Sequence, residues 1–573
     1  MNVSTFRRFL TLFYLILAPA VYGQTYTVLY NFGSTGCDPI IPVNNGIIAQ
    51  GRDGSLYSTA GHGCPGNGTA FKISANATMT VLHSFNGGGG DGYAPNSGLT
   101  LTGGGTFVGT TEGADFNAGT LFVMTPNGTL TNLDNAFGGT KGVNGGEPIA
   151  PPIQGMDGNY YGMTTAGGDV TKCTSGNGGC GVIYRITPSG RYTVIHTFEE
   201  GEGANPKDRL LLAADGNLYG TTFYGGTVNS RYIGNGVIFK ITPAGQYTGL
   251  YVFCSTNCLD GGQPAASLTQ GLDGNFYGTT IIGGTHLFSN FFGGTIFKLT
   301  PQGVYSVLYN FCSQPNCSDG GQAVANLIQA TDGNFYGTTQ VGGANGYGVI
   351  FQLTPEGQYT VLYNFDFVHG LGPLVPLTQG TNGVLYGDTS GGGSGHSVDC
   401  GGNGCGVFYS LDMGLPSYAN LETWWGQQGS TIELLGQGFT GTTGVSFNGT
   451  PATFQVVSDT YLTAVVPPGA TVGLVTVNTP KGALTSNIPF RVLPYVGSFT
   501  PTSGPVGTSV TINGSGFTGT IGVGFGDTNP AQFTVNSDSQ ITATVPSGAK
   551  TGPVGVETKT GTAISTQIFT VTQ

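Results

Sequence analysis

Short runs of aromatic and β-branched residues alternate with glycine-rich turns along the first two thirds of the chain. Tyr, Phe, Val and Ile fill these runs with little alternation of polar and apolar positions, so both faces of each predicted strand are expected to be covered. Each period holds four runs, which in one copy lie around Leu268 and at residues 276–280, 295–300 and 305–311. The pattern predicts small four-stranded sheets, each packed between two neighbours.

The segment DGNFYGTT, which begins at Asp273, recurs along the chain. Seven copies, two of them degenerate, begin 50 to 59 residues apart at Asp53, Gly103, Asp157, Asp215, Asp273, Asp332 and Asn382. A second motif, GVIFKITP at residues 236–243, has a counterpart after each first motif and leads through a Thr-Pro-x-Gly turn to the fourth run. Repetition at this period is typical of propellers and solenoids.

The two ends of the repeat region favour a closed ring over an open solenoid. The repeats begin with a fourth-strand motif at residues 26–32, whereas the last copy stops after a third-strand motif at residues 406–411. The start of the chain therefore supplies the strand that the last blade lacks, and a solenoid would need polar caps instead. We predict an all-β fold whose first part is a seven-bladed β-propeller, closed by pairing residues 26–32 with residues 407–411.

The pattern DGNFYGTTxxGG…GxIFKLTPxGxYTVLYNF resembles the tandem repeat called GloVer, which occurs in secreted bacterial proteins that carry a variable choice of C-terminal anchor. The resemblance covers roughly residues 24–412 and implies export and repetition. It implies no activity. This sequence departs from the family's usual ending, because neither a hydrophobic tail nor a sorting signal follows.

From about Met413 the period changes to roughly 79 residues. The segment that begins at Pro501 aligns with a weaker copy ending at Phe439, and residues 537–546 match residues 458–467. Both copies resemble the IPT/TIG immunoglobulin-like family, whose members are small β-sandwiches. We predict two such domains, at 413–492 and 493–573, that serve as a spacer, a stalk or a docking module.

The net charge indicates which partners are unsuitable, and the N-terminal segment indicates where the protein is located. The net charge is −12 and the 17 basic residues are scattered, so no positive stripe is available for a phosphate backbone and nucleic acid is an unsuitable partner. Arg7 and Arg8 precede an apolar run at residues 9–18, with a cut expected before Gln24. Residues 1–23 are therefore predicted to be a signal peptide. The mature protein is expected to be secreted, at the cell surface or in the periplasm, without a transmembrane segment.

All ten cysteines lie in the repeat region, and an even count in an exported chain indicates disulfides. They fall in the connections from strand 2 to strand 3 and from strand 4 to the next strand 1, which emerge on one face of an up-and-down propeller. The predicted pairs are Cys37 with Cys64, Cys173 with Cys180, Cys254 with Cys258, Cys312 with Cys317, and Cys400 with Cys405. A zinc site is disfavoured, because it would need two close pairs converging on one ion.

No residue is assigned a catalytic role, and no cofactor or metal is expected, with Ca²⁺ kept as an alternative. The aspartate that begins most DGN turns recurs in nearly every blade, which indicates turn chemistry. Four acids near the cysteine-rich face, Asp91, Glu147, Asp260 and Asp319, are candidate ligand-binding residues, with turn capping as the alternative that their regular recurrence favours. The six histidines, at positions 62, 83, 196, 286, 369 and 396, show no ligand spacing.

Two functions from different classes remain. The first is a non-catalytic binding or structural protein whose cysteine-rich face holds an extracellular polysaccharide or an envelope protein. Its candidate contacts are Phe288, Phe291 and Phe292, within the aromatic insertions 227–235 and 286–292. The second is an extracellular polysaccharide-active enzyme, a glycoside hydrolase or a lyase, that uses two of the loop acids.

Overall fold

The computed structural model describes residues 23–573, apart from 35–37, 43–46, 64–65, 88–89, 114–118, 135–136, 138–141, 174–177, 228–233, 256, 289–290, 396–397 and 527–529. Residues 1–22 of the predicted signal peptide thus lie outside the described residues. The described chain is built from strands and contains two short 3₁₀ helices, η2 (Pro315–Cys317) and η3 (Val398–Asn403). None of its helices is long and apolar enough to cross a membrane.

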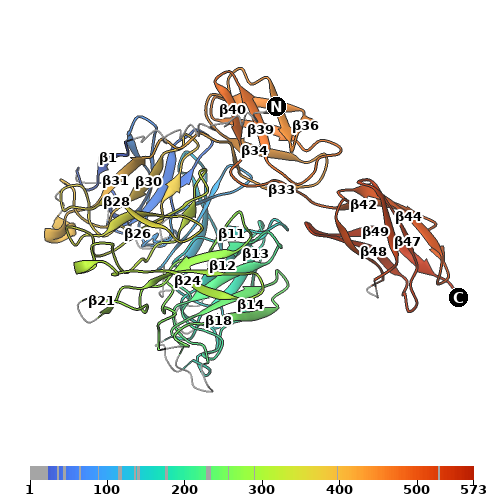
Figure 1. Cartoon of the computed structure of the whole chain (residues 1–573), viewed down its shortest axis with the longest axis horizontal. Coiled ribbons are helices and arrows are strands. Elements are labelled where there is room, and N and C mark those ends of the chain that lie inside the picture. The colour runs from blue at the N-terminus through green and yellow to red at the C-terminus, as the bar shows by residue number, and fades with distance from the viewer. Residues whose placement is uncertain are drawn as a thin grey trace, which may run out of the picture.

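Seven sheets make up the first part of the described chain, six with four strands and one with five (Figure 1). Blades 1 to 4, from the inner strand outward, are β3 (Ala49–Gln50), β4 (Leu56–His62), β5 (Thr69–Ile73), β6 (Met79–Ser84); β7 (Thr100–Leu101), β8 (Phe107–Thr111), β9 (Thr120–Met124), β10 (Leu130–Asp134); β11 (Ile153–Gln154), β12 (Tyr160–Thr164), β13 (Val182–Ile186), β14 (Tyr192–Thr197); and β15 (Leu211–Leu212), β16 (Leu218–Thr222), β17 (Val237–Ile241), β18 (Tyr247–Val252). The fifth strand of blade 1, β2 (Ile40–Pro42), also pairs with β4.

Blades 5 to 7 repeat the same order. Their strands are β19 (Thr269–Gln270), β20 (Phe276–Thr279), β23 (Thr295–Leu299), β24 (Tyr305–Asn310); β25 (Ile328–Gln329), β26 (Phe335–Thr339), β27 (Val349–Leu353), β28 (Tyr359–Asn364); and β29 (Thr378–Gln379), β30 (Leu385–Asp388), β31 (Val407–Asp412), β1 (Thr25–Asn31). A hairpin of β21 (Leu287–Phe288) and β22 (Phe291–Phe292) is inserted between β20 and β23 of blade 5.

The ring closes as the sequence predicts. Strand β1 is the outer strand of blade 7 and pairs antiparallel with β31, from Thr25 opposite Asp412 to Asn31 opposite Val407. In Figure 1 the blue β1 lies beside the gold β31 and β30. The first segment of the repeat region thus completes its last blade, and the predicted seven-bladed propeller is confirmed.

Buried aromatic and aliphatic side chains lie between the blades. Seven apolar clusters, each drawn from two adjacent blades, follow one another around the described ring. One of them contains Phe408 of blade 7 and Phe71 of blade 1, so packing crosses the closure as well. Both faces of each sheet are therefore covered, which explains why the strands lack polar alternation.

The propeller has two different ends. On the loop face, the strand 4-to-1 connections pair with the strand 2-to-3 connections, as in the bridges between Gly262 and Ile282 and between Gly321 and Val341. The opposite end, the turn face, carries the tight turns between strands 1 and 2 and between strands 3 and 4. In those turns a glycine supplies the positive φ that other residues rarely adopt, for example 80° at Gly274.

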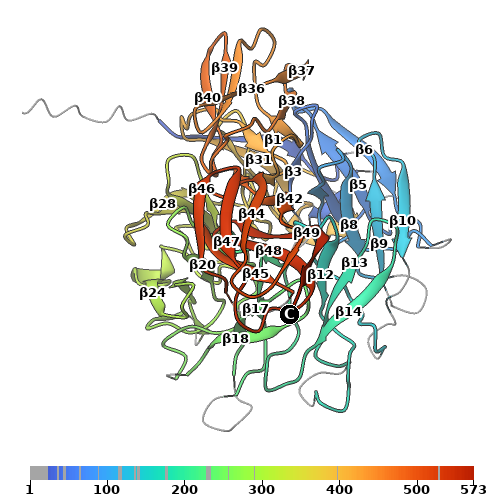
Figure 2. The same ribbon diagram turned by 90° about the vertical axis from the view of Figure 1, so that its right-hand side faces the viewer.

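Two β-sandwiches follow the propeller. The first, TIG1, has sheets of β32 (Asn420–Leu421), β34 (Thr431–Leu435), β38 (Tyr461–Val465), β37 (Phe454–Ser458) and of β36 (Thr450–Ala452), β35 (Gly444–Phe447), β39 (Val475–Thr479), β40 (Gly482–Thr485), with β33 (Trp425–Gly426) parallel to β41 (Arg491–Val492). The second, TIG2, has β42 (Tyr495–Thr500), β44 (Ser509–Ser515), β47 (Gln540–Thr544), β46 (Phe533–Ser537) and β43 (Ser503–Gly504), β49 (Gly561–Val571), β48 (Gly552–Thr558), β45 (Thr520–Phe525). Figure 2 shows TIG2 in front of the ring, with TIG1 above it.

Candidate functional site

The repeated aspartates stabilise the tight turns. Asp273 accepts a hydrogen bond from the backbone N–H of Asn275 at 3.1 Å and another from the hydroxyl of Tyr277 at 2.8 Å. The same pair of contacts recurs at the other DGN-type aspartates, Asp53, Asp157, Asp215 and Asp332. These carboxylates anchor a buried tyrosine to its own turn, which is the structural role that their recurrence predicts.

TIG1 covers part of the turn face. The backbone N–H of Tyr418 donates to the carbonyl oxygen of Thr381 at 3.0 Å, and the hydroxyl of Thr460 donates to the carbonyl oxygen of Arg52 at 2.7 Å. Arg52 and Thr381 lie in the strand 1-to-2 turns of blades 1 and 7. These contacts place TIG1 on the turn face, away from the variable connections of the loop face.

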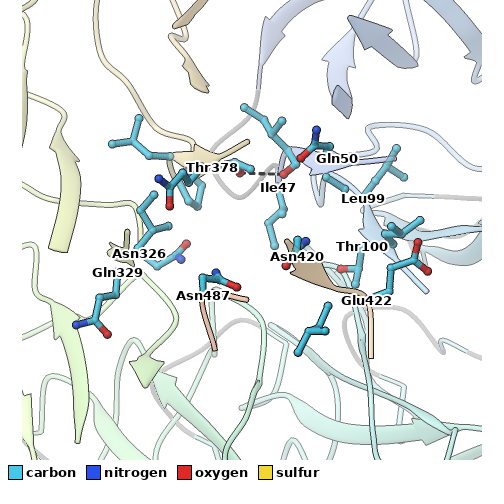
Figure 3. Close-up of a pocket in the computed structure, with 18 of the residues that line it drawn as sticks. Ile47, Gln50, Leu99, Thr100, Asn326, Gln329, Thr378, Asn420, Glu422 and Asn487 are labelled. Atoms are coloured by element: carbon cyan, nitrogen blue, oxygen red, sulfur yellow. Dashed lines mark hydrogen bonds between the residues drawn. The ribbon is translucent and has the colours of Figure 1, made fainter. Parts of the chain in front are cut away.

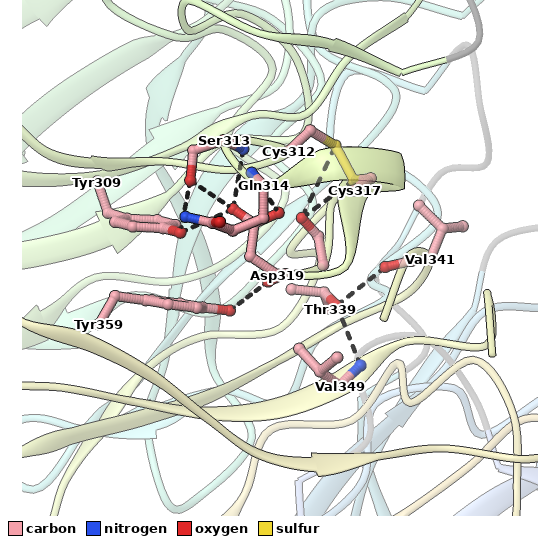
Figure 4. Close-up of a disulfide and its surroundings, with 11 residues drawn as sticks. Tyr309, Cys312, Ser313, Gln314, Cys317, Asp319, Thr339, Val341, Val349 and Tyr359 are labelled. Atoms are coloured by element: carbon pink, nitrogen blue, oxygen red, sulfur yellow. Dashed lines mark hydrogen bonds between the residues drawn. A yellow bond between two sulfur atoms is a disulfide. The ribbon is translucent and has the colours of Figure 1, made fainter. Parts of the chain in front are cut away.

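Two of the four candidate acids hold their own loops. Asp319 accepts hydrogen bonds from the hydroxyls of Tyr309 and Ser313, both at 2.7 Å, and from the Ser313 N–H at 2.9 Å (Figure 4). Asp260 is bound in the same way by Tyr251 and Ser255. Both aspartates are buried, so their carboxylates fix the strand 4-to-1 connections of blades 5 and 4.

The other two acids lie on the loop face of blades 1 to 3. Asp91 Oδ2 lies 3.4 Å from His83 Nε2. Burial raises the pKa of Glu147, and the charge of Glu112 raises it further, whereas Lys207 opposes the rise. The charges of Glu112 and Lys207 thus both act on Glu147, and the three residues come from the loops of three successive blades. Glu147 was predicted from the sequence as a candidate, whereas Glu112 and Lys207 were not, because neither stands in a recurring motif.

Exposed aromatic rings occur on the same face. Tyr347 and Phe367 have 39% and 38% of their surface exposed, and their ring centroids lie 6.3 Å apart in an edge-to-face arrangement. Across the face, Lys207 Nζ lies 4.9 Å from the centroid of Phe223, and the neighbouring Tyr224 is 40% exposed. These residues were not singled out from the sequence, although Tyr224 lies two residues after a second-strand motif and Tyr347 lies directly before a third-strand motif.

The structure describes only part of the two predicted aromatic insertions, residues 227–235 and 286–292. Phe288, Phe291 and Phe292 belong to the β21–β22 hairpin on the strand 2-to-3 connection, but their side chains lie outside the described residues. Most of the other insertion, residues 228–233, lies outside them as well. The contribution of both segments to binding stays a prediction.

Four disulfides link cysteines within single connections of the loop face. They join Cys173 to Cys180, Cys254 to Cys258, Cys312 to Cys317, and Cys400 to Cys405. These are the four local pairs that the sequence predicts. The fifth predicted pair, Cys37 with Cys64, lies outside the described residues. Figure 4 shows the Cys312–Cys317 bridge next to the loop that Asp319 fixes.

Three of the described histidines, His83, His196 and His369, each lie close to one carboxylate. His369 Nδ1 lies 2.9 Å from Asp366 Oδ1, and His196 Nε2 lies 3.3 Å from Glu202 Oε2 without hydrogen-bond geometry. Burial lowers the pKa of His196 to about 4. Among the described residues, no three His, Cys, Asp or Glu side chains come together in a way that could hold a metal ion.

A cavity of about 320 Å³ lies where the inner strands of the propeller meet TIG1 (Figure 3). Residues of β3, β7, β25 and β29 line it from the ring, and Tyr418, Asn420 and Asn487 line it from TIG1. This cavity, called the channel cavity below, was not predictable from the sequence, because its walls come from segments that are distant along the chain.

A closed ring of seven blades with variable connections on one face, followed by two β-sandwiches, defines a β-propeller protein with immunoglobulin-like domains. The chain belongs to the Gloeobacter/Verrucomicrobia repeat family, whose model matches residues 15–229, 171–318 and 233–453. The IPT/TIG domain model matches residues 416–492 and 494–572. These matches confirm both resemblances drawn from the sequence. No curated protein has a sequence significantly similar to this chain.

Solved structures show distant similarity. A fungal alcohol oxidase of the AA5 family in complex with copper shares 13% identity at a TM-score of 0.42, over 82% of this chain and 100% of that one. SGBP-B, from a complex xyloglucan utilization locus in Bacteroides uniformis, shares 19% identity at a TM-score of 0.14, over 25% of this chain and 46% of that one. A surface glycan-binding protein from Prevotella bryantii shares 23% identity at a TM-score of 0.19, over 26% of this chain and 38% of that one. All three TM-scores lie below 0.5, so we draw no functional conclusion from them.

Proposed function

We propose that this chain is an exported, non-catalytic protein that binds extracellular polysaccharide through the loop face of its propeller. The observation that carries the proposal is the set of exposed rings at Tyr224, Tyr347 and Phe367, which stand on the face opposite TIG1. Aromatic rings bind sugar faces well, since they offer a large apolar area with few rotamers to immobilise. The disulfides support export, because such bonds persist in oxidising compartments.

Charge and hydrogen-bonding capacity support a sugar ligand. The chain has a net charge of −12 and only 8% charged residues, so its surface offers mostly amides, hydroxyls and backbone groups. Such groups suit the neutral hydroxyls of a polysaccharide. TIG1, docked on the turn face, leaves the loop face free, and TIG2 acts as a spacer or docking module.

Binding to a panel of soluble polysaccharides, measured by affinity electrophoresis and titration calorimetry, tests the proposal. Replacing both Tyr347 and Phe367 by Ala should lower the affinity for any bound polysaccharide roughly tenfold or more, as expected for exposed aromatic contacts. Tyr495→Ala, which removes an exposed tyrosine of TIG2, is the matched control and should bind normally. Capture of an envelope protein without any polysaccharide binding would contradict the proposal.

A second candidate function is a polysaccharide-active enzyme, a glycoside hydrolase or a lyase. The observation that favours it is the raised pKa of Glu147, caused by burial and by the charge of Glu112, since an acid with a raised pKa can perform acid–base chemistry. Reducing-sugar and unsaturated-product assays on the bound polysaccharide distinguish the two functions. Activity that is lost in Glu147→Gln would establish the enzyme.

A further inference from the structure

The channel cavity is lined by polar groups from both the ring and TIG1. Gln50, Thr100, Asn326 and Gln329 come from three blades, and Asn420 and Asn487 come from TIG1. Figure 3 shows Asn487 between Asn326 and Asn420. At about 320 Å³, the cavity lies at the lower end of the range for small-molecule sites, roughly 300–1,000 Å³.

Two charged residues lie among the described lining residues, Arg209 and Glu422. Both carboxylate oxygens of Glu422 are bound by Arg52, at 2.8 and 2.7 Å. The guanidinium of Arg209, by contrast, has no hydrogen-bond acceptor among the described residues. Burial lowers its pKa, which is the effect of placing a charge away from water.

The carboxylate next to Arg209 does not neutralise it through hydrogen bonds. Asp208 Oδ1 accepts from the backbone N–H of Arg209 at 2.6 Å, and Oδ2 accepts from the N–H of Ser267 at 2.7 Å. Both oxygens are therefore engaged by the backbone. A guanidinium carries five N–H donors in a planar fork, and the half-buried side chain of Arg209 leaves these donors available to a ligand.

Three further polar atoms in the lining also lack partners among the described residues. They are Thr100 Oγ1, Asn326 Oδ1 and Asn487 Oδ1, all of which are shielded from solvent. Oxygen atoms of this kind accept hydrogen bonds from hydroxyl groups. The cavity thus combines one uncommitted cation with several uncommitted acceptors.

We propose that the channel cavity binds a small carboxylate that also carries hydroxyl groups, with Arg209 paired to the carboxylate. A planar guanidinium matches a carboxylate with two parallel hydrogen bonds, and the amide and threonine oxygens accept from the hydroxyls. This site is separate from the loop face and does not rest on polysaccharide binding there. Because Asn420 and Asn487 complete the lining, an occupant would contact the ring and TIG1 together and stabilise their docking.

Titration calorimetry and thermal unfolding of the mature chain test this site, with D-glucuronate, D-glucose and inorganic phosphate as probes. D-glucuronate should bind with one site per chain and raise the melting temperature, whereas D-glucose, which lacks the carboxylate, should not. Arg209→Gln should weaken D-glucuronate binding about tenfold to hundredfold, as expected for the loss of a charged hydrogen-bond partner. Arg191→Gln, an exposed arginine in a turn of blade 3, is the matched control and should leave binding unchanged.

A second variant covers the case in which Arg209→Gln fails to fold. Asn487→Asp adds a negative charge from TIG1, outside the ring, and should also reduce D-glucuronate affinity at least tenfold through like-charge repulsion. Equal binding of D-glucose, binding of phosphate alone, or unchanged D-glucuronate affinity in both variants would overturn the proposal. So would the absence of D-glucuronate binding, which would leave the cavity to water. Tyr347→Ala should leave D-glucuronate binding intact, which separates this site from the loop face.

Discussion

Arg52 and Glu422, which are 370 residues apart in the chain, form a two-point ion pair between the propeller and TIG1. Nε of Arg52 donates to Oε1 of Glu422 at 2.8 Å, and Nη2 donates to Oε2 at 2.7 Å. The guanidinium also lies 4.4 Å from the centroid of the Tyr461 ring. The Glu422 side chain is fully buried, whereas that of Arg52 is 26% exposed. A turn of blade 1 is thereby attached to the first immunoglobulin-like domain.

Arg52→Ala should weaken the docking of TIG1 by about 2–3 kcal/mol, because it leaves the buried Glu422 carboxylate without its partner. Release of TIG1 from the propeller can be measured by small-angle scattering of the whole chain and by limited proteolysis of the segment between β31 and β32. The matched control is Lys72→Ala, which removes an exposed ion pair with Asp53 in the same blade and should cost less than about 1 kcal/mol. An equal, small effect of both variants would show that the Arg52–Glu422 pair does not hold the domain.

Closure of the ring can be tested at Tyr26. Its ring stacks on Tyr363 with centroids 3.8 Å apart and planes 6° apart, and it also contacts Tyr409. Tyr26→Ala should lower the free energy of unfolding by about 2–3 kcal/mol, since it removes a half-buried aromatic side chain. Thr27→Ala, on the exposed side of the same strand, should change it by less than about 0.5 kcal/mol.

Removal of residues 25–31 should have a larger effect than any point substitution on this strand. The deletion unpairs β31 and exposes a strand edge, which promotes association of molecules. Light scattering and calorimetry should then report aggregation and a lower melting temperature. A truncated chain that stays monomeric and melts at an unchanged temperature would contradict closure by β1.

The disulfides should contribute unequally to stability. Cys254 and Cys258 are four residues apart, so their bridge closes a short loop and should stabilise the fold by about 2 kcal/mol in the chain-entropy description. The predicted Cys37–Cys64 bridge closes a longer loop and should contribute about 3.5 kcal/mol. Peptide mapping without reduction, followed by denaturant unfolding of the paired Cys→Ser variants, measures both. A free thiol among the ten cysteines, or cross-pairing between blades, would contradict the assignment.

His196 should make the propeller acid-sensitive. Burial lowers its folded-state pKa from the ordinary 6.5 to about 4, so between these values the unfolded state binds more protons than the folded state. Stability is therefore lost as the pH falls from 6.5 to 4, by about 2 kcal/mol after allowance for partial exposure of the ring. Unfolding titrations at both pH values measure the change.

The control for this pH dependence is His196→Phe, which keeps the ring stacked on Tyr247 but does not titrate. Burial raises the pKa of Asp208 to about 6, which acts in the opposite direction over the same range. Asp208 is present in both proteins, so its contribution cancels in their difference. If the two proteins lose stability equally on acidification, His196 is not the responsible group.

Several features of the loop face were predictable from the sequence because their causes are local and repeated. A cysteine four to seven residues from another has few alternative partners, which is why the four local bridges were predicted correctly. For Asp260 and Asp319 the sequence left two roles open, ligand binding and turn capping. Whether such a carboxylate meets a ligand or its own loop depends on where neighbouring hydroxyls point, and here Tyr251 and Tyr309 occupy the carboxylates.

By itself, the sequence determined that each blade has four strands, how many blades there are, which strand closes the ring and that two sandwich domains are present. Each of these follows from periodic patterns, in which every copy of DGNFYGTT reports the same local turn and the same buried strand. Only the tertiary structure decided that TIG1 docks on the turn face through Arg52 and Glu422, and that Arg209 lines the channel cavity. Those contacts join single, unrepeated residues from distant segments, and their energies depend on surface complementarity that no local pattern encodes.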